Sequence, residues 1–187
     1  MKKIVFLFTL FLGFSLVSNA QINRRQLNSV SKKTTKPLKK SNQKIFLKID
    51  GIDGEATDER HTKWIVLKSF YFDNNLVTSS GEDLYSLSFS KLPDISSVDL
   101  AKFADNKKHI SKIELEITET VRGKQVPIFK YEFENVFVHL YSMQKKNANK
   151  NLIENIKLLS SLVKIKHYQY DKSGNLKNSN ERTLRRN

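Results

Sequence analysis

The stretch that decides the fold runs from Ile45 to Phe72 and reads IFLKIDGIDGEATDERHTKWIVLKSFYF. Its opening residues place Ile45, Leu47 and Ile49 on one face, which predicts a strand with one buried side. A charged segment with two glycines follows at residues 50–60 and predicts a turn. The run that begins at Trp64 is almost wholly apolar, and it predicts a strand buried on much of both faces.

Working outward from this pair, four more segments have strand character. Residues 84–90 and 110–118 alternate apolar and polar side chains, residues 127–141 change phase near Asn135, which predicts a bulge, and residues 152–170 predict a final strand that breaks or bulges at Ser160-Ser161. One short helix is expected, capped by Ser96 or Ser97 and ended at residues 106–108. The sum is mainly β: an antiparallel β-barrel or sandwich of two sheets with one short α-helix.

The segments before and after these strands differ from them in composition. Residues 1–20 have two lysines, an apolar run and small residues before Ala20, which predicts a Sec signal peptide cleaved between Ala20 and Gln21. We therefore expect export to the periplasm or the medium. The expected organisation is a signal peptide at 1–20, a basic linker at 21–44, the β domain at 45–170 and a basic polar tail at 171–187.

The net charge of +14 is carried mainly by the linker and the tail. Residues 21–44 contain eight Lys and Arg and no acid, whereas residues 45–170 are nearly neutral. A neutral domain argues against a specific nucleic-acid interface. We interpret the linker as a solvated tether; the alternative is an electrostatic hook for lipopolysaccharide, anionic lipid or nucleic acid.

Three groups of residues were weighed as chemical sites. The acids of the 50–60 turn do not have the spacing of an EF-hand, because Ile52 and Asp58 stand where a ligand and a glycine are required. The four histidines are far apart and the chain has no Cys, so we expect neither a zinc site nor another cofactor. The aromatic residues on the strands are interpreted as core, with a binding platform as the alternative. No nucleophile or phosphate-binding motif is present.

Four blocks resemble the Hcp (haemolysin-coregulated protein) family, which forms the tube of the type VI secretion system. The first is FLKIDGIDGE from Phe46 to Glu55, followed by Asp58, His61 and Trp64-Ile65. The others are Leu87 to Lys91 with Asp94 and Ser96-Ser97, Lys107 to Ile110, and Glu154 to Leu158. The signal peptide and the basic linker are additions to the family pattern.

The resemblance implies a β-barrel of two sheets that forms hexameric rings, has no catalytic residues and has effector or spike proteins as partners. We therefore expect a non-enzymatic structural protein that forms ring-shaped homo-oligomers and holds secreted cargo. The residues expected at the interface between copies are Asp50, Asp53, Glu55, Asp58 and His61. The alternative is an exported monomeric binding module, attached to anionic surfaces through its basic segments.

Overall fold

The computed structural model divides the chain into two units, Met1–Lys40 and Ser41–Asn187. It describes residues 42–77, 83–145 and 151–186, all of them in the second unit. The expected signal peptide, its cleavage site at Ala20 and Gln21, and most of the basic linker lie outside the described residues. Everything below concerns the second unit.

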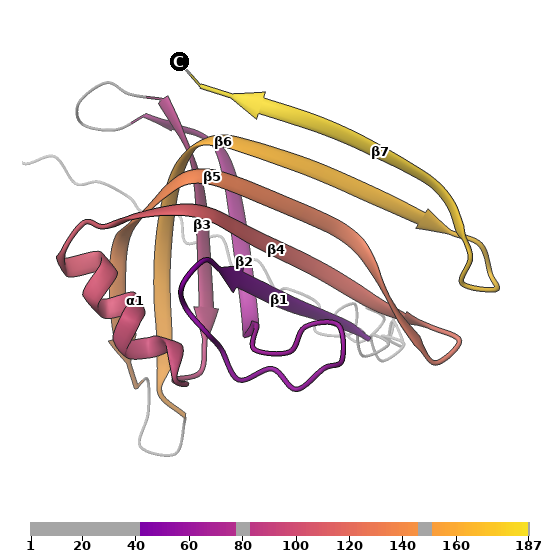
Figure 1. Ribbon diagram of the computed structural model, residues 1–187, viewed down its shortest axis with the longest axis horizontal. Coiled ribbons are helices and arrows are strands. Elements are labelled where there is room, and N and C mark those ends of the chain that lie inside the picture. Colours follow the sequence, from indigo (N-terminus) through magenta and orange to yellow (C-terminus); the bar gives the residue numbers. More distant parts are fainter. Residues whose placement is uncertain (1–41, 78–82, 146–150, 187) are drawn as a thin grey trace, which may run out of the picture. The chain divides into compact units, whose positions relative to one another are not determined.

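Seven antiparallel strands and one helix make up the described residues (Figure 1). In chain order they are β1 (Gln43–Ile49), β2 (Ile65–Val77), β3 (Asp83–Lys91), α1 (Ser96–Asp105), β4 (His109–Val121), β5 (Lys124–Gln144), β6 (Ile153–Tyr170) and β7 (Leu176–Arg185). The sheet order is β3-β2-β1-β4-β5-β6-β7, and an additional β3–β6 pairing closes the sheet into a barrel. The expected class, antiparallel β with one short helix, is confirmed.

Alternating side chains fill the barrel. Ile45, Leu47 and Ile49 lie opposite Ile117, Leu115 and Ile113 of β4, and the last two are completely buried. The same rows continue into β5 through Phe129, Tyr131 and Phe133. Phe89 and Phe133 are buried, as the core interpretation of the strand aromatics expects, whereas Phe70 and Phe72 pack partly buried against the core.

Strand β6 changes its neighbour halfway along. Its first half pairs with β3 as far as Ser160, and its second half pairs with β7 from Leu162 onward. The Ser160 hydroxyl lies 2.7 Å from the carbonyl oxygens of Glu134 and Leu162, so it satisfies backbone groups at the change. The irregularity expected at Ser160-Ser161 is therefore a change of partner within one continuous strand.

The phase change expected in β5 is present, but it is not a bulge. Asn135 has a positive φ of 53°, and both Glu134 and Asn135 are exposed. The pairing with β4 keeps the same register on either side of Asn135, and the register shift with β6 lies between Val138 and Leu140. The backbone bends at Asn135 without inserting a residue.

Strand β7 corrects the expected boundary of the domain. The expected domain ends at Tyr170 and residues 171–187 are expected to form a tail, whereas β7 pairs with β6 from Leu162 to Tyr170. Asp171 makes the turn possible, because its carboxylate accepts hydrogen bonds from the backbone N–H groups of Ser173 (2.8 Å) and Asn175 (2.9 Å). The strand was missed because nearly all its side chains are exposed and polar, so it shows no alternation.

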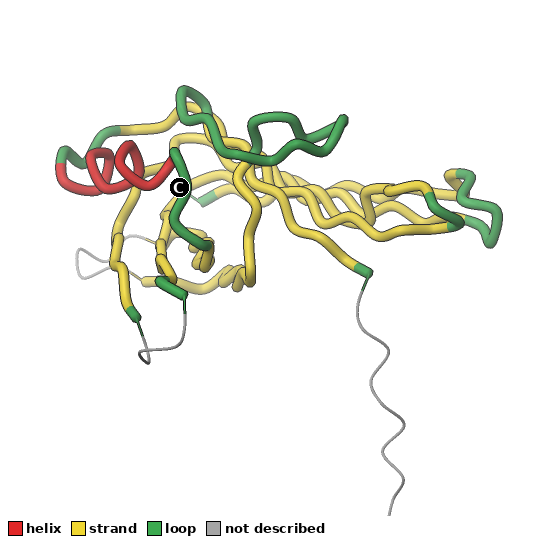
Figure 2. Tube along the Cα trace, turned by 90° about the horizontal axis from the view of Figure 1, so that it is seen from below, coloured by secondary structure: helices red, strands yellow, loops and turns green. Residues whose placement is uncertain are grey.

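Helix α1 lies at the end of the strands opposite the β4–β5 and β6–β7 turns (Figure 2). The helix begins at Ser96, one or two residues before the start that a cap at Ser96 or Ser97 predicts, and neither serine caps it with its side chain. Asp94 does so instead, accepting a hydrogen bond of 2.9 Å from the Ser96 N–H. The helix ends before Asn106, and Lys107 turns the chain with a φ of 48°.

Candidate interface at the 50–60 turn

The 50–60 turn begins with a tight reversal of β1. Gly51 has a φ of 79°, a conformation that favours glycine, and the Ile52 N–H donates back to the Ile49 carbonyl at 3.1 Å. Ile52 is buried in the core. The start of the turn is therefore fastened to the barrel by an apolar side chain.

The rest of the turn folds against the residues that lead into β2. The Gly54 N–H donates to the Lys63 carbonyl (2.7 Å), the Ala56 N–H to the Trp64 carbonyl (2.9 Å), and the Lys63 N–H to the Ala56 carbonyl (2.9 Å). A Cβ atom on Gly54 would overlap the backbone carbonyl of Trp64, so only glycine fits there. Because these residues belong to the turn, β2 begins at Ile65, one residue later than expected.

Three of the five expected interface residues are exposed acids with partners in the same chain. Asp50 accepts a hydrogen bond from the Ser111 hydroxyl at 2.7 Å, Asp53 forms an exposed ion pair with Lys63 at 3.0 Å, and Glu55 accepts from the Ile95 N–H at 3.2 Å. These contacts tie the turn to β4 and to the start of α1. The turn therefore presents carboxylates in defined positions.

The other two expected interface residues, Asp58 and His61, are less exposed. The His61 side chain is buried, with 1% of the residue exposed, so it is not a surface contact in the single chain. Its Nδ1 atom lies 2.8 Å from an Asp58 carboxylate oxygen, and its Nε2 atom lies 2.9 Å from a carboxylate oxygen of Glu116 on β4. The sequence does not predict the contact between His61 and Glu116, because the two residues are 55 positions apart in the chain.

Aromatic rings enclose the His61 imidazole. It stacks on Phe46 of β1 with ring centroids 4.0 Å apart, and it meets Trp64 edge-on at 4.9 Å. The Arg60 guanidinium lies 3.6 Å from Glu116 on the solvent side. The imidazole therefore lies between two carboxylates in a site that is largely shielded from solvent.

The charges around His61 shift its pKa and that of Asp58. Burial alone would lower the pKa of His61, but the hydrogen bonds to Glu116 and Asp58 and the charges of both carboxylates raise it above its ordinary value. Burial would raise the pKa of Asp58, but hydrogen bonds from His61 and the Arg60 N–H, and the charges of His61 and Lys44, lower it. Both shifts favour an imidazolium beside a carboxylate.

A second buried cation lies where β3, β6 and the start of α1 meet. Lys91 is completely buried, and its ammonium contacts Asp94 at 2.7 Å and Glu154 at 2.6 Å. It also donates to the Leu92 carbonyl and the Ser97 hydroxyl. The Tyr141 hydroxyl donates to the other oxygen of Glu154 at 2.9 Å. This cluster joins two of the blocks quoted above, the one from Leu87 to Ser97 and the one that begins at Glu154, but the sequence did not predict it.

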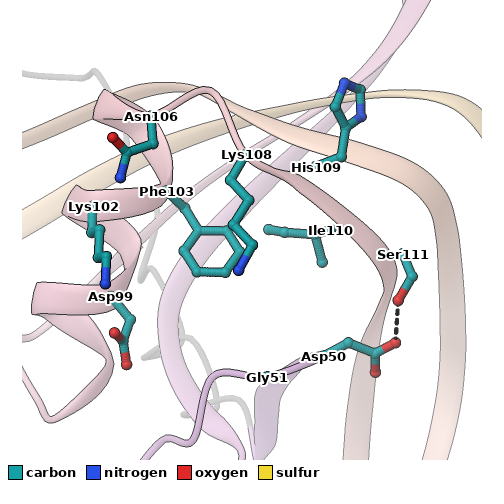
Figure 3. Close-up of a pocket in the computed structure, with 10 residues that line it drawn as sticks. All are labelled: Asp50, Gly51, Asp99, Lys102, Phe103, Asn106, Lys108, His109, Ile110 and Ser111. Carbon is teal, nitrogen blue, oxygen red and sulfur yellow. Dashed lines mark hydrogen bonds between the residues drawn. The ribbon is translucent and has the colours of Figure 1, made fainter.

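A hollow of about 440 Å³ lies between the start of the turn and α1 (Figure 3). Asp50 and Ser111 form one side of it, and Asp99, Lys102 and Asn106 the other. The Lys108 ammonium lies 4.8 Å from the centre of the Phe103 ring. The lining of the hollow contains both acids and lysines, and these side chains are exposed. The hollow therefore does not select one class of small molecule.

Exposed apolar side chains lie next to Glu55 of the turn. We name this patch the turn–helix surface, and it consists of Glu55, Val66, Pro93, Ile95 and Val98. Ile95 is 59% exposed and Val98 76% exposed, and at three positions apart they share one face of the helix start. Glu55, Val66 and Pro93 also line a hollow of about 270 Å³. The sequence does not indicate this patch, because Val66 belongs to an apolar run that predicts a buried strand.

Two further features concern only the residues that the structure describes. No group of three His or acidic side chains gathers there in a way that could hold a metal ion. No helix in the same part of the chain is long and apolar enough to cross a membrane.

Comparison with known proteins identifies the family. The family model described as "Type VI secretion system effector, Hcp" matches residues 46–167. No match was found among the curated proteins. One solved structure, "Structure of a type six secretion system protein", is 25% identical with a TM-score of 0.68, and the match covers 76% of this chain and 94% of that one.

Two Salmonella typhimurium structures are similar as well. Hcp1 is 24% identical with a TM-score of 0.64, covering 77% of this chain and 95% of that one. Hcp2 is 26% identical with a TM-score of 0.59, covering 76% and 94%. A match over residues 46–167 includes most of β1 and β6, every element between them and both buried clusters, and the folds agree. The chain therefore belongs to the Hcp family of type VI secretion system proteins.

Proposed function

We propose that this chain is a non-enzymatic structural subunit that assembles into closed rings of six identical copies for a type VI secretion system. Membership of the Hcp family supports the class of function. The observation that carries self-assembly is the turn–helix surface, where apolar side chains are exposed beside ordered carboxylates. An apolar centre with a charged rim is the usual composition of a protein–protein interface.

The proposed interface has two layers. Val66, Ile95 and Val98 form its apolar centre, and the carboxylates of Asp50, Asp53 and Glu55 form part of its rim. Asp58 and His61 act from beneath by holding the turn in place rather than by touching the neighbouring copy. The folded residues together with β7, 45–187, have a net charge of +4, far below the +14 of the whole chain, and this favours the arrangement because identical copies then meet with little repulsion.

Closed rings require a heterologous contact, in which this surface meets a different surface of the next copy. The proposed partners beyond the ring are the effector and spike proteins of a secretion system. We also propose that the chain is exported after cleavage between Ala20 and Gln21. Intact mass measurement of the exported protein tests that step, because a chain that still begins at Met1 contradicts it.

Light scattering after size exclusion tests the interface, using the chain from Gln21 to Asn187. We expect a mass of six subunits, and we expect Val98→Asp and Ile95→Asp each to lower the mass to that of the monomer. Both side chains are exposed, so the substitutions leave the single chain folded. The matched control is Leu176→Asp on β7, also an exposed apolar residue, which should leave the mass unchanged.

Two outcomes would contradict the proposal. A monomeric wild-type chain over a wide range of concentration would contradict ring assembly, and the basic segments would then need another function. A hexamer that survives both substitutions would place the interface elsewhere on the barrel.

A further inference from the structure

The imidazole of His61 makes two hydrogen bonds to acceptors that are both carboxylates. An imidazole has two N–H groups only when it is protonated, and a neutral ring has one. Asp58 and Glu116 lie 2.8 and 2.9 Å from the two ring nitrogens. Loss of one proton therefore leaves a nitrogen lone pair facing a carboxylate, and one of the two contacts becomes repulsive.

The surroundings prevent water from replacing the lost contact. His61 and Glu116 are both buried, and Phe46 and Trp64 cover the ring. A polar atom without a partner is costly in such a site, because it has lost its hydration and gains nothing in return. The neutral ring thus lacks one hydrogen bond in this buried site, whereas the protonated ring makes both.

The two carboxylates belong to different parts of the molecule. Asp58 lies in the 50–60 turn, whereas Glu116 lies in the middle of β4 and pairs with Phe46 of β1. His61 is also joined to the turn through its backbone, with its N–H donating to the Asp58 carbonyl at 3.0 Å and its carbonyl accepting from the Trp64 N–H at 2.9 Å. The imidazole therefore bridges the turn and the barrel wall.

We propose that His61 is a proton-dependent lock, which holds the 50–60 turn against β1 and β4 while the ring carries two N–H groups and loosens the turn when it carries one. The other charged and titratable groups that face this site come from three elements. Arg60 of the turn covers Glu116, Lys44 of β1 acts on Asp58, and the Tyr170 hydroxyl of β6 lies within the influence of Arg60 and Glu116. Arg60 forms an ion pair with Glu116 and the charge of Lys44 acts on Asp58, but neither can substitute for the second N–H of the ring.

The direction of the pH dependence follows from the raised pKa of His61. The lock is closed below the ordinary histidine value of about 6.5, and it opens as the pH rises through the higher folded value. The acid limit is set by Asp58, whose contribution is lost as the pH falls through its lowered pKa. The turn is therefore held most firmly in the mildly acidic range.

Fluorescence reports the titration directly, because Trp64 is the only tryptophan of the chain and touches the His61 ring. A protonated imidazole in contact with an indole quenches its emission. We expect the emission of the full mature chain to rise in one step with a midpoint above about pH 6.5. His61→Gln should abolish the step, Glu116→Gln should move its midpoint down, and His139→Gln, at an exposed histidine, should leave it unchanged.

Hydrogen exchange then tests the loosening, expressed as protection factors so that the intrinsic pH dependence of exchange is removed. The amides of Gly54, Ala56 and Lys63 report on the turn, and that of Ile113 reports on the barrel. Above the midpoint we expect turn protection to fall by about tenfold or more, the effect of losing one charged hydrogen bond, with Ile113 unchanged. In Glu116→Gln this fall should disappear, because an amide can pair with a neutral imidazole through either its oxygen or its nitrogen.

Either of two results would overturn the proposal. One is a midpoint that does not move in Glu116→Gln. The other is turn protection that stays constant while the fluorescence step occurs. Both readouts come from the single chain, so neither depends on whether rings form.

Discussion

Two buried clusters in this protein have the same arrangement of charges but fasten different elements of the fold. In each, a cation lies between two carboxylates: His61 between Asp58 and Glu116, and Lys91 between Asp94 and Glu154. The first fastens an exposed turn to the barrel. The Lys91 cluster fastens the start of α1 to β6 in the interior of the barrel. The same device therefore serves a surface element in one place and a core element in the other.

The difference lies in the cation and in its exposure. Lys91 brings three N–H donors to a completely buried site, where the Leu92 carbonyl and the Ser97 hydroxyl also accept from it. His61 brings at most two donors to a site whose Asp58 carboxylate is partly exposed. Histidine is the side chain that ordinarily changes charge between about pH 5 and pH 8. The comparison teaches that the same arrangement can be made adjustable near neutral pH by placing a histidine between the carboxylates.

The largest effect is expected for Lys91→Met, which keeps the volume of the side chain but leaves the carboxylates of Asp94 and Glu154 without a cation. We expect the free energy of unfolding to fall by about 3–5 kcal/mol, measured by urea denaturation at pH 7. Adding Glu154→Gln should recover part of this loss. Lys102→Met on the exposed side of α1 is the matched control, and it should change stability by less than about 0.5 kcal/mol.

If Lys91→Met lowers the free energy of unfolding by less than about 1 kcal/mol, the two clusters do not differ in the way described. Removal of one partner from a fully buried ion pair is expected to destabilise the protein by more than that.

His61→Gln is expected to have a smaller effect that depends on pH. The folded pKa of His61 is raised, so its stabilisation is fully present below about pH 6.5 and is lost as the pH rises through the folded value. The variant should lose about 1.5–3 kcal/mol at pH 6, and the difference from the wild type should shrink in alkaline solution. Equal losses at pH 6 and pH 9 would mean that the imidazolium has no special contribution.

Tyr141→Phe removes one hydrogen bond from the Lys91 cluster and leaves both of its ion pairs. Burial and the adjacent Glu154 raise the pKa of Tyr141 to about 12. We expect a loss of about 0.5–1.5 kcal/mol in thermal or urea unfolding, and the disappearance of the tyrosine that ionises near that pH. Tyr71→Phe is the control, because Tyr71 is exposed and should change neither quantity.

The smallest effect is expected for Lys63→Met, which breaks the exposed ion pair with Asp53 in the turn. Such pairs contribute about 0–1 kcal/mol and are screened by salt. Urea denaturation should show a loss in that range that vanishes in high salt. A larger, salt-insensitive loss would mean that the turn is held by this pair as well as by His61.

Local patterns in the sequence predicted most of the fold. Alternation identified β1, β3 and β4, because one face of each is buried and the other is not. Ser96 and Ser97 predicted the start of the helix to within two residues, although neither of them caps it. Strand β7 was missed for the opposite reason: its residues from Leu176 to Arg185 are almost all exposed and polar, so only pairing with β6 makes them a strand.

The candidate site was predicted less completely. The acids of the 50–60 turn stood out by composition, and Asp50, Asp53 and Glu55 are indeed exposed on it. What composition does not show is that His61 meets Glu116, or that Lys91 meets Glu154, since these partners come from strands far apart in the chain. The turn–helix surface was missed because exposure of Val66, Ile95 and Val98 is a property of the folded barrel and not of their residue types.

The central claim is that copies of this chain close into rings, and negative-stain electron microscopy of the chain from Gln21 to Asn187 tests it most directly. Image averages should show closed rings with six-fold symmetry in the wild type, and only single subunits in Val98→Asp. Averages that contain only single subunits in the wild type, at concentrations where the protein is folded, would contradict the account.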